Sequence, residues 1–156
     1  MAAANGSRTV WLFDLDNTLH DATHAAMPGI NAGMTDYIVE FLGVERDVAD
    51  ELRRSYWRRY GATLLGLVRH HGVRPSHFLH YTHRLPGLEA RVRGHPHDVA
   101  ALRRLPGRKI ILTNAPRAYA ERVLDALGIG GWFDGLVSVE DMRMFGQLRP
   151  KPDTRM

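Results

Sequence analysis

Two aspartates stand two positions apart at the end of an apolar run. Asp14 and Asp16 follow residues 11–13, and Asn17 and Thr18 come directly after them. Because side chains alternate along a strand, positions i and i+2 lie on one side of it, roughly 6–7 Å apart. Two carboxylates that converge at the end of a buried strand repel each other and lose solvation. A bound cation, or a division of roles between a nucleophile and an acid/base, would explain the arrangement.

Three further polar residues can join these aspartates. Thr113 ends a second apolar run, residues 109–113, Asn114 precedes a predicted helix, and Lys151 lies in a loop after residues 136–139. Parallel sheets bind ligands beyond the carboxyl ends of their strands, and a helix N-terminus offers free N–H groups to phosphate. An ammonium about 4 Å from a phosphate contributes roughly 4 kcal/mol at an effective dielectric near 20. Together these features predict a phosphoryl-transfer site.

The apolar periodicity predicts an α/β fold. Strands are expected at residues 9–15, 109–113 and 136–139, and helices at residues 30–42, 44–60, 64–71, 75–84, 96–105 and 116–127. Residues 86–94 are expected to be irregular, and residues 146–152 to form a loop. Alternating strands and helices predict a parallel, Rossmann-like sheet. The long helical stretch after the first strand predicts an inserted all-α cap, residues 21–93, in a discontinuous core, residues 1–20 and 94–156.

The composition is that of an ordinary globular protein. The chain has 156 residues, of which 44% are hydrophobic and 24% charged, and it has no cysteine, which excludes disulfides and thiolate chemistry. No run approaches the ~20 apolar residues of a membrane span, and residues 1–8 lack the apolar core of a signal peptide, so a cytoplasmic location is expected. The net charge of +4 would steer anionic substrates, but it is scattered, so nucleic-acid binding is not expected.

Three segments of the chain match one family in order and in strand context. Residues 14–19, Asp-Leu-Asp-Asn-Thr-Leu, resemble motif one of the haloacid dehalogenase-like (HAD) hydrolases. Residues 113–114, Thr-Asn, resemble motif two, and residues 151–152, Lys-Pro, resemble motif three. The resemblance covers essentially the whole chain and implies the HAD fold with its inserted cap.

The resemblance implies a role for each motif residue. Asp14 would attack phosphorus and form an aspartyl-phosphate, and Asp16 would protonate the leaving oxygen and then activate water. Thr113, Asn114 and Lys151 would bind the phosphate. Mg²⁺ would bind the Asp14 carboxylate and the Asp16 main-chain carbonyl. The implied activity is therefore Mg²⁺-dependent hydrolysis of a small phosphorylated substrate.

Two segments narrow the resemblance to pyrimidine 5′-nucleotidase-like proteins. They are Asp-Asn-Thr-Leu-His at residues 16–20 and Tyr-Gly-Ala-Thr-Leu-Leu-Gly-Leu at residues 60–67. The implied substrate is a nucleoside 5′-monophosphate such as UMP or CMP. The first motif also argues against a dehalogenase, because Asp16 supplies the acid/base that a dehalogenase lacks.

A fourth family motif, an acid after a further strand, would complete the magnesium shell. The sequence ends five residues after Lys151, so we expect a C-terminally truncated core. Its first strand would then be an exposed apolar edge, a hazard for aggregation or swapping. Losing one carboxylate would weaken Mg²⁺ binding, and Asp141 and Asp153 are candidates to replace it.

Other interpretations stay open. The chain could be a non-catalytic remnant that binds phosphate or a protein partner, or a phosphomutase whose cap excludes water, and a homodimer is also open. Several side chains outside the motifs favour structural roles. His20 is expected to be a surface or satisfied histidine, and the three tryptophans are expected to pack. Solvated helix faces are expected for the remaining groups: His77, His80 and His83, and Arg53, Arg54, Arg58 and Arg59 pairing with Asp50 and Glu51.

Overall fold

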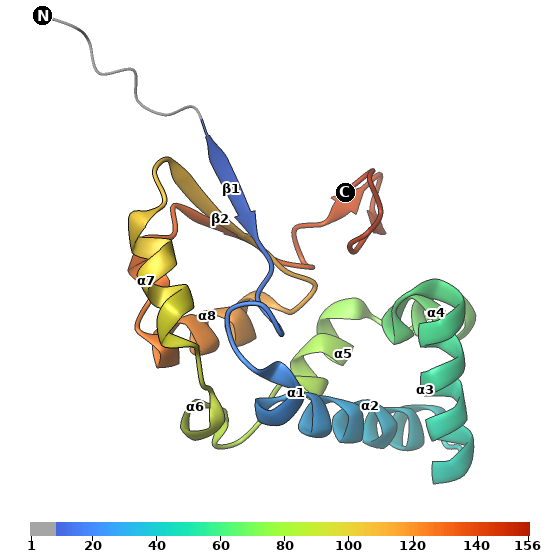
Figure 1. Ribbon diagram of the computed structural model, residues 1–156. Coiled ribbons are helices and arrows are strands. Elements are labelled where there is room, and N and C mark those ends of the chain that lie inside the picture. The colour runs from blue at the N-terminus through green and yellow to red at the C-terminus, as the bar shows by residue number, and fades with distance from the viewer. Residues whose placement is uncertain (1–8) are drawn as a thin grey trace, which may run out of the picture.

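A computed structural model describes residues 9–156. The prediction that residues 1–8 are not a signal peptide concerns residues outside this range. Figure 1 shows a small sheet with helices beside it, and a separate group of helices that the chain enters after its first strand. The strands are β1 (Val10–Phe13), β2 (Arg108–Leu112), β3 (Gly135–Val137), β4 (Arg143–Met144) and β5 (Gln147–Leu148). The helices are α1 (Ala22–Ala25), α2 (Met27–Leu42), α3 (Arg46–Tyr60), α4 (Thr63–His71), α5 (Pro75–Thr82), α6 (Leu88–Arg91), α7 (Pro96–Arg104) and α8 (Arg117–Leu127), with a 3₁₀ turn, η1 (Gly130–Trp132).

The three main strands form a parallel sheet, which confirms the predicted fold class. Their order is β1-β2-β3, with Leu12 paired to Ile110 and Ile111 paired to Leu136. Helix α8 connects β2 to β3, and its apolar side chains join a buried cluster with Ile111 and Leu15. Because the strands are parallel, their carboxyl ends lie at one edge, where the motif residues follow them.

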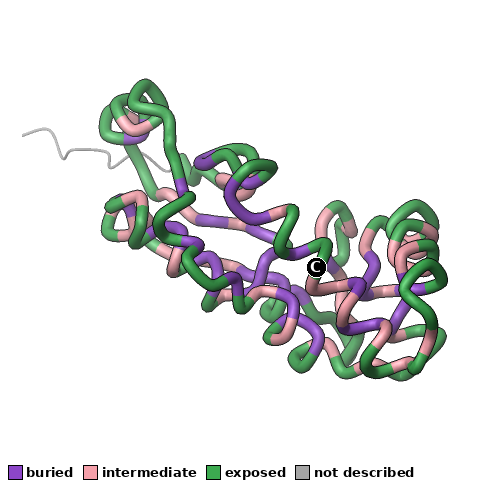
Figure 2. The backbone as a smooth tube through the Cα atoms, turned by 90° about the horizontal axis from the view of Figure 1, so that it is seen from below, coloured by how far each residue is buried: buried purple, intermediate pink, exposed green. Residues whose placement is uncertain are grey.

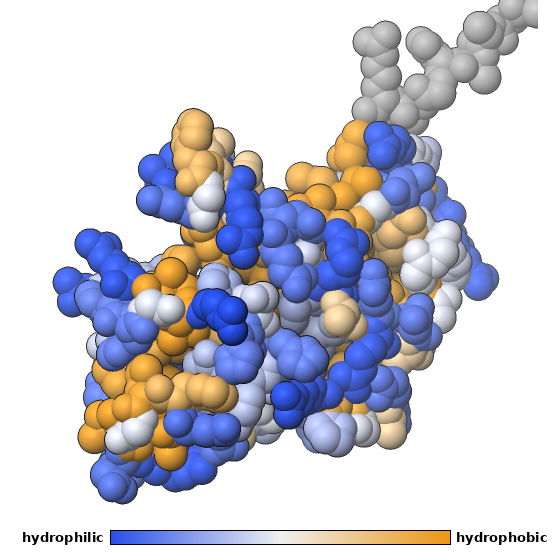
Figure 3. All heavy atoms as spheres, turned by 180° about the vertical axis from the view of Figure 1, so that it is seen from behind, coloured by the Kyte–Doolittle hydropathy of each residue, from blue (hydrophilic) through white to orange (hydrophobic). Residues whose placement is uncertain are grey.

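Strand β1 lies at the edge of the sheet and exposes apolar side chains, as predicted. Val10 is 51% exposed and Leu12 is 63% exposed, whereas Ile111 on β2 is fully buried. Figure 3 shows apolar atoms gathered beside the point where the grey trace joins β1. Alternation puts Val10 and Leu12 on one face of the sheet, so that face receives little cover at this edge.

Helices α2 to α5 pack around a second buried cluster. It includes Tyr37 and Ile38 from α2, Leu67 from α4 and Phe78 from α5. Figure 2 shows buried segments inside both the sheet region and this helical group. Helix α2 ends at Leu42, as the predicted range 30–42 indicates, and Gly43 follows with a φ of 66°, the left-handed conformation that glycine adopts without strain.

Gly66 lets helices α3 and α4 approach each other closely. A Cβ atom at this position would lie 2.2 Å from Cγ of Tyr56, far inside van der Waals contact. The segment of residues 60–67, which carries the nucleotidase resemblance, thus forms the end of α3, the turn at Gly61 and the start of α4. Part of its sequence therefore serves helix packing.

Two short elements differ from the prediction. Residues 86–94, expected to be irregular, contain α6, and its Leu88 is fully buried. Four residues are too few to show helical periodicity, so sequence could not identify this helix. Residues 146–152, expected to be a loop, contain β5, which pairs with β4 through a turn at Phe145 and Gly146, both at positive φ. This turn lacks the Asn-Gly or Asp-Gly signal of most such hairpins. In the described range, no helix combines the length and apolarity that crossing a membrane requires.

Candidate active site

Strand β1 carries Asp14 to the edge where the parallel strands end. Lys151 Nζ lies 2.7 Å from Asp14 Oδ1 and also donates a hydrogen bond to the Leu112 carbonyl at 2.6 Å. These two charged residues are 137 positions apart, so the fold alone brings them together. Thr18 Oγ1 donates to Asp14 Oδ2 at 3.4 Å. The Asp14 side chain remains 46% exposed and the Lys151 side chain 24% exposed, which leaves both accessible to a ligand.

Asn114 fixes the loop that carries the lysine. Its Nδ2 donates to the Lys151 carbonyl at 3.0 Å, and its Oδ1 accepts from the Lys151 N–H at 2.8 Å. Thr113 is 1% exposed, and its hydroxyl oxygen accepts from the Ala115 N–H at 3.0 Å. In the described part of the chain, the Thr113 hydroxyl makes no hydrogen bond to Asp14, Asn114 or Lys151. Direct hydrogen bonds therefore connect Asp14, Lys151 and Asn114. Thr113, next to Asn114 in the sequence, is buried without a side-chain bond to these three.

The helix N-terminus expected to bind phosphate is partly occupied. The N–H of Arg117, the first residue of α8, donates to Glu140 Oε2 at 2.7 Å. A carboxylate is a natural partner for this positive end of the helix. The expectation of free N–H groups is thus wrong for Arg117.

Asp16 is held by two buried side chains. Tyr119 donates its hydroxyl to Asp16 Oδ1 at 2.7 Å, and His20 Nε2 lies 2.8 Å from the same oxygen. Burial, and next the nearby Asp16 charge, raise the pKa of Tyr119, so its hydroxyl stays protonated and donates. His20 Nδ1 is buried and has no partner among residues 9–156, which favours the tautomer that carries its proton on Nε2. Since both bonds use Oδ1, the second carboxylate oxygen of Asp16 is left for a ligand.

A turn separates the paths of the two aspartates. β1 ends at Phe13, so the predicted strand over residues 9–15 is shorter and its alternation does not extend to Asp16. Asn17 adopts a φ of 57°, and its Oδ1 accepts from the Thr23 N–H at 2.9 Å. Asparagine tolerates this left-handed conformation better than most residues. The turn leaves Asp14 paired with the lysine while Asp16 meets α8.

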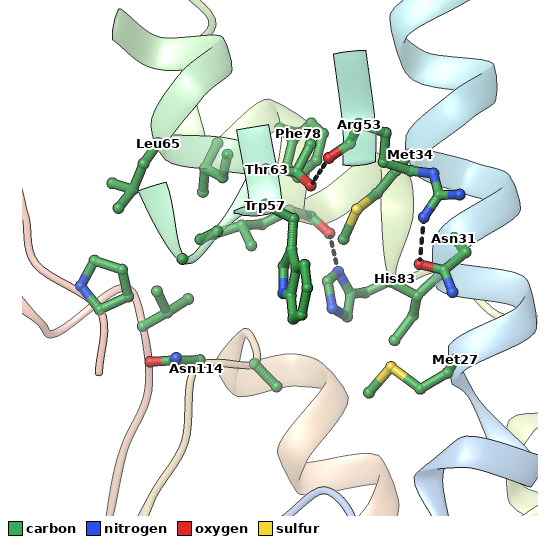
Figure 4. Close-up of a pocket in the computed structure, with 18 of the residues that line it drawn as sticks. Met27, Asn31, Met34, Arg53, Trp57, Thr63, Leu65, Phe78, His83 and Asn114 are labelled. Carbon is green, nitrogen blue, oxygen red and sulfur yellow. Dashed lines mark hydrogen bonds between the residues drawn. The ribbon is translucent and has the colours of Figure 1, made fainter. Parts of the chain in front are cut away.

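A cavity of about 450 Å³ opens between the helical group and the edge of the sheet (Figure 4). Asp16 and Asn114 line it from the sheet side, and Trp57 lines it from α3. Its walls are mainly apolar, formed by Met27, Ile30, Met34, Leu64, Leu65, Phe78 and Leu79 among others. The segment of residues 61–65, from the nucleotidase-like motif, also lines it. An apolar cavity with a few polar groups is the usual form of a small-molecule site.

His83 reaches this cavity from the end of α5, which corrects the prediction of a solvated histidine. Burial lowers the pKa of His83 to about 4, so the ring is neutral at neutral pH. Its Nδ1 lies 3.1 Å from the Leu79 carbonyl and 2.9 Å from Thr82 Oγ1. Because the Thr82 hydroxyl donates to the Phe78 carbonyl at 2.9 Å, both neighbours of Nδ1 act as acceptors, so the proton lies on Nδ1 and Nε2 is left as an acceptor. His83 also packs on Tyr119, with ring centroids 5.4 Å apart.

Metal ligation in residues 9–156 is limited to few carboxylates. No group of three or more His, Asp or Glu side chains in this range could hold a metal ion. The candidate replacements for a third acid pair with arginines instead: Asp141 with Arg117 at 2.8 Å and Asp153 with Arg149 at 3.1 Å. A hydrogen bond from Arg155 further holds the pKa of Asp153 below its usual range. Neither candidate is therefore free to replace the third acid beside Asp14 and Asp16.

The sequence pattern of the haloacid dehalogenase-like hydrolases matches residues 9–156, which include all three motifs. The chain belongs to this family. Among curated proteins, Phosphate metabolism protein 8 of Saccharomyces cerevisiae is 30% identical over 63 residues, which are 40% of this chain and 20% of the yeast protein.

Solved HAD structures share the fold. A HAD phosphatase from Thermococcus onnurineus superimposes with a TM-score of 0.52 at 19% identity, covering 85% of this chain and 62% of that one. A predicted phosphatase from Clostridium acetobutylicum gives a TM-score of 0.50 at 18% identity, covering 83% and 60%. The chain thus spans less than two thirds of the length of each of these relatives.

Proposed function

We propose that the protein hydrolyses phosphate monoesters, with Asp14 as the nucleophile and Asp16 as the general acid and base. The contact between Asp14 Oδ1 and Lys151 Nζ carries this proposal. It unites a carboxylate and an ammonium from opposite ends of the sequence at an exposed site, where each can meet a phosphate. The Asp14 side chain is 46% exposed and the Lys151 side chain 24% exposed, so both groups are accessible to a phosphate.

The reaction takes two steps. A carboxylate oxygen of Asp14 attacks phosphorus, the bond from phosphorus to the ester oxygen breaks, and Asp16 gives its proton to that oxygen. Asp16 then takes a proton from water as the water oxygen attacks the aspartyl-phosphate, and the bond between phosphorus and Asp14 breaks to release inorganic phosphate. Because Tyr119 and His20 occupy Oδ1 of Asp16, the proton moves through its Oδ2.

The phosphate would be held by Lys151, with Asn114 keeping the lysine loop in place and the Thr113 hydroxyl proton free to donate. Mg²⁺ fits the residues present, because this ion is commonly bound through one or two carboxylates together with substrate phosphate oxygens. Asp14, and Asp16 through its main-chain carbonyl, would hold it. When bound, the ion would neutralise charge on the phosphoryl oxygens.

The substrate we propose is a nucleoside 5′-monophosphate, supported by the nucleotidase-like segment that lines the cavity. Residues 21–93 would act as a cap that closes this cavity over the substrate. The phosphatases among the structural neighbours support the reaction class. A cytoplasmic location and a homodimer remain predictions from the sequence.

One observation supports a second candidate, a protein that binds phosphate without turnover. The described residues lack a third acid for the metal, and Mg²⁺ demands near-ideal octahedral coordination. Calorimetry with phosphate and Mg²⁺, alongside assays for free phosphate, separates the two. Binding without any release of phosphate from a monoester would establish the second candidate.

Asp14→Asn tests the proposed mechanism. With p-nitrophenyl phosphate and Mg²⁺, this variant should lose turnover, and mass spectrometry of rapidly quenched enzyme should no longer detect a phosphorylated peptide containing residue 14. Asp125→Asn, an exposed aspartate on α8, is the matched control and should keep wild-type activity. Full activity in Asp14→Asn would exclude the aspartyl-phosphate route. With a sugar phosphate as the substrate, an isomerised sugar phosphate in place of free phosphate would identify a phosphomutase.

A further inference from the structure

Trp57 is a large aromatic side chain that packing does not explain. It is 64% exposed on α3, and Figure 4 shows its indole ring projecting into the cavity. In the described part of the chain, its indole N–H has no hydrogen-bond partner. Burying such a ring in the core would contribute more to stability than leaving it in solvent. An exposed ring on a cavity wall instead offers a flat face on which a ligand ring can stack.

Asn31 presents an oriented hydrogen-bond donor to the same cavity. Arg53 Nη1 donates to Asn31 Oδ1 at 3.1 Å, a contact drawn in Figure 4, and Arg53 also reaches Asp50 Oδ1 at 3.5 Å. The Thr35 hydroxyl donates to that same Asp50 oxygen at 2.7 Å. Because Oδ1 of Asn31 is occupied, the amide orientation is set and its Nδ2 is left to donate to a ligand.

His83 supplies the complementary acceptor. Its Nδ1 proton is directed at the Leu79 carbonyl and Thr82 Oγ1, so the neutral ring offers Nε2, and His83 lines the same cavity. The cavity therefore combines one stacking face, one donor and one acceptor with apolar walls. This set matches a flat ring that carries a carbonyl oxygen next to a ring N–H.

We propose that this cavity recognises the base of a nucleotide, with the ring stacked on Trp57, a carbonyl accepting from Asn31 and a ring N–H donating to His83. Asp16 lines the other side of the same cavity, so a ring at Trp57 and a phosphate at Asp14 can belong to one molecule. Uracil and guanine each carry this edge, whereas adenine has no carbonyl and cytosine has no N–H next to its carbonyl; uracil is the smaller of the two rings and is the base we propose. The proposal rests on the proposed function for the phosphate, and it assigns the base-binding residues.

Binding of uridine, which has no phosphate, tests this proposal apart from catalysis. Titration of the full 156-residue chain should shift the NMR signal of the Trp57 indole N–H, identified by its loss in Trp57→Phe. Trp57→Ala should lower the affinity for uridine roughly tenfold or more, because one base stack is lost, while Trp57→Phe should retain most of the affinity. Asn31→Asp, which replaces the donor by an acceptor, should also weaken uridine. Val48→Ala, another exposed apolar residue on α3, is the control.

Selectivity provides the second measurement. UMP should bind more tightly than CMP or AMP, and ribose 5-phosphate should bind Trp57→Ala as well as it binds the wild type. The proposal would be overturned if uridine did not bind, or if Trp57→Ala bound uridine as tightly as the wild type does. It would also be overturned if Trp57→Ala lost as much affinity for ribose 5-phosphate as for uridine. If Trp57→Ala lost affinity for uridine and the wild type released no phosphate, the proposal of base binding would stand and the proposed hydrolase activity would be wrong. The two proposals thus fail separately.

Discussion

Replacing Lys151 with methionine separates the catalytic role of its ammonium from its structural role. Methionine keeps the unbranched stem of the side chain, one atom shorter, and removes the contacts to Asp14 Oδ1 and to the Leu112 carbonyl. A partly exposed ion pair contributes about 0–1 kcal/mol to the free energy of unfolding, and one hydrogen bond about 1 kcal/mol. The variant should therefore lose about 1–2 kcal/mol of a total of about 5–15 kcal/mol, and it should fold.

The expected loss of activity is larger. An ammonium about 4 Å from a phosphoryl group contributes roughly 4 kcal/mol at an effective dielectric near 20, and each 1.36 kcal/mol corresponds to about tenfold in rate. Lys151→Met should lower kcat/KM for p-nitrophenyl phosphate by about a thousandfold. Asn114→Ala keeps the ammonium and removes the two bonds that hold the lysine loop, so it should cost only about tenfold.

The assay pairs steady-state kinetics with urea unfolding for each variant. Lys109→Met is the matched control, because Lys109 is the other lysine of the chain and lies on β2, and this variant should keep its activity. If Lys151→Met stayed within threefold of wild-type kcat/KM, or lost activity only in proportion to its unfolded fraction, the assignment of Lys151 to the phosphate would be wrong.

Two further predictions concern stability. Because burial lowers the pKa of His83 from 6.5 to about 4, the unfolded chain binds more protons than the folded chain between these values, and stability should rise by about 3 kcal/mol as pH increases through that window. In urea unfolding between pH 4 and 6.5, His83→Gln should show a smaller rise in the free energy of unfolding, and the exposed His97→Gln should show the same rise as the wild type. Parallel pH curves for the wild type and His83→Gln would refute the prediction. Gly66→Ala should lower the free energy of unfolding by about 1–3 kcal/mol, because its Cβ would meet Tyr56 at 2.2 Å. Gly131→Ala, with no atom within 4 Å of the added Cβ, should be nearly neutral, and equal melting temperatures for the two would contradict the packing argument.

The fold was predictable where periodicity and glycine act locally. The strand predicted at residues 109–113 corresponds to β2 (Arg108–Leu112), and it came from a run of apolar residues. The predicted helices over residues 30–42 and 116–127 end where α2 and α8 end, each followed by a glycine at positive φ. The β4–β5 hairpin was not predictable, because its turn places Phe145 at a positive φ and carries no favoured turn dipeptide. Contacts with the rest of the chain, and not the turn residues themselves, must therefore stabilise this turn.

The site was predictable in its sequence motifs and not in its surroundings. Asp14 and Lys151 were expected at one edge because parallel strands end together, and the structure joins them. Arg53 pairs with Asp50 as expected, yet it also faces the cavity and contacts Asn31. Trp57 was expected to pack and is exposed instead. Helical periodicity identifies a face of a helix but not what lies opposite that face, which only tertiary structure decides.

Tyr119 links the two halves of the site. Its hydroxyl holds Asp16, and its ring packs on His83, which belongs to the helical group and lines the cavity. In the sequence it is one apolar position on α8, so no local signal distinguishes it from Val123 on the same stripe. One side chain thus contacts both the proposed acid/base and the proposed base-binding wall. The Asp16 carboxylate and the His83 ring on the cavity wall therefore share one contact residue, Tyr119.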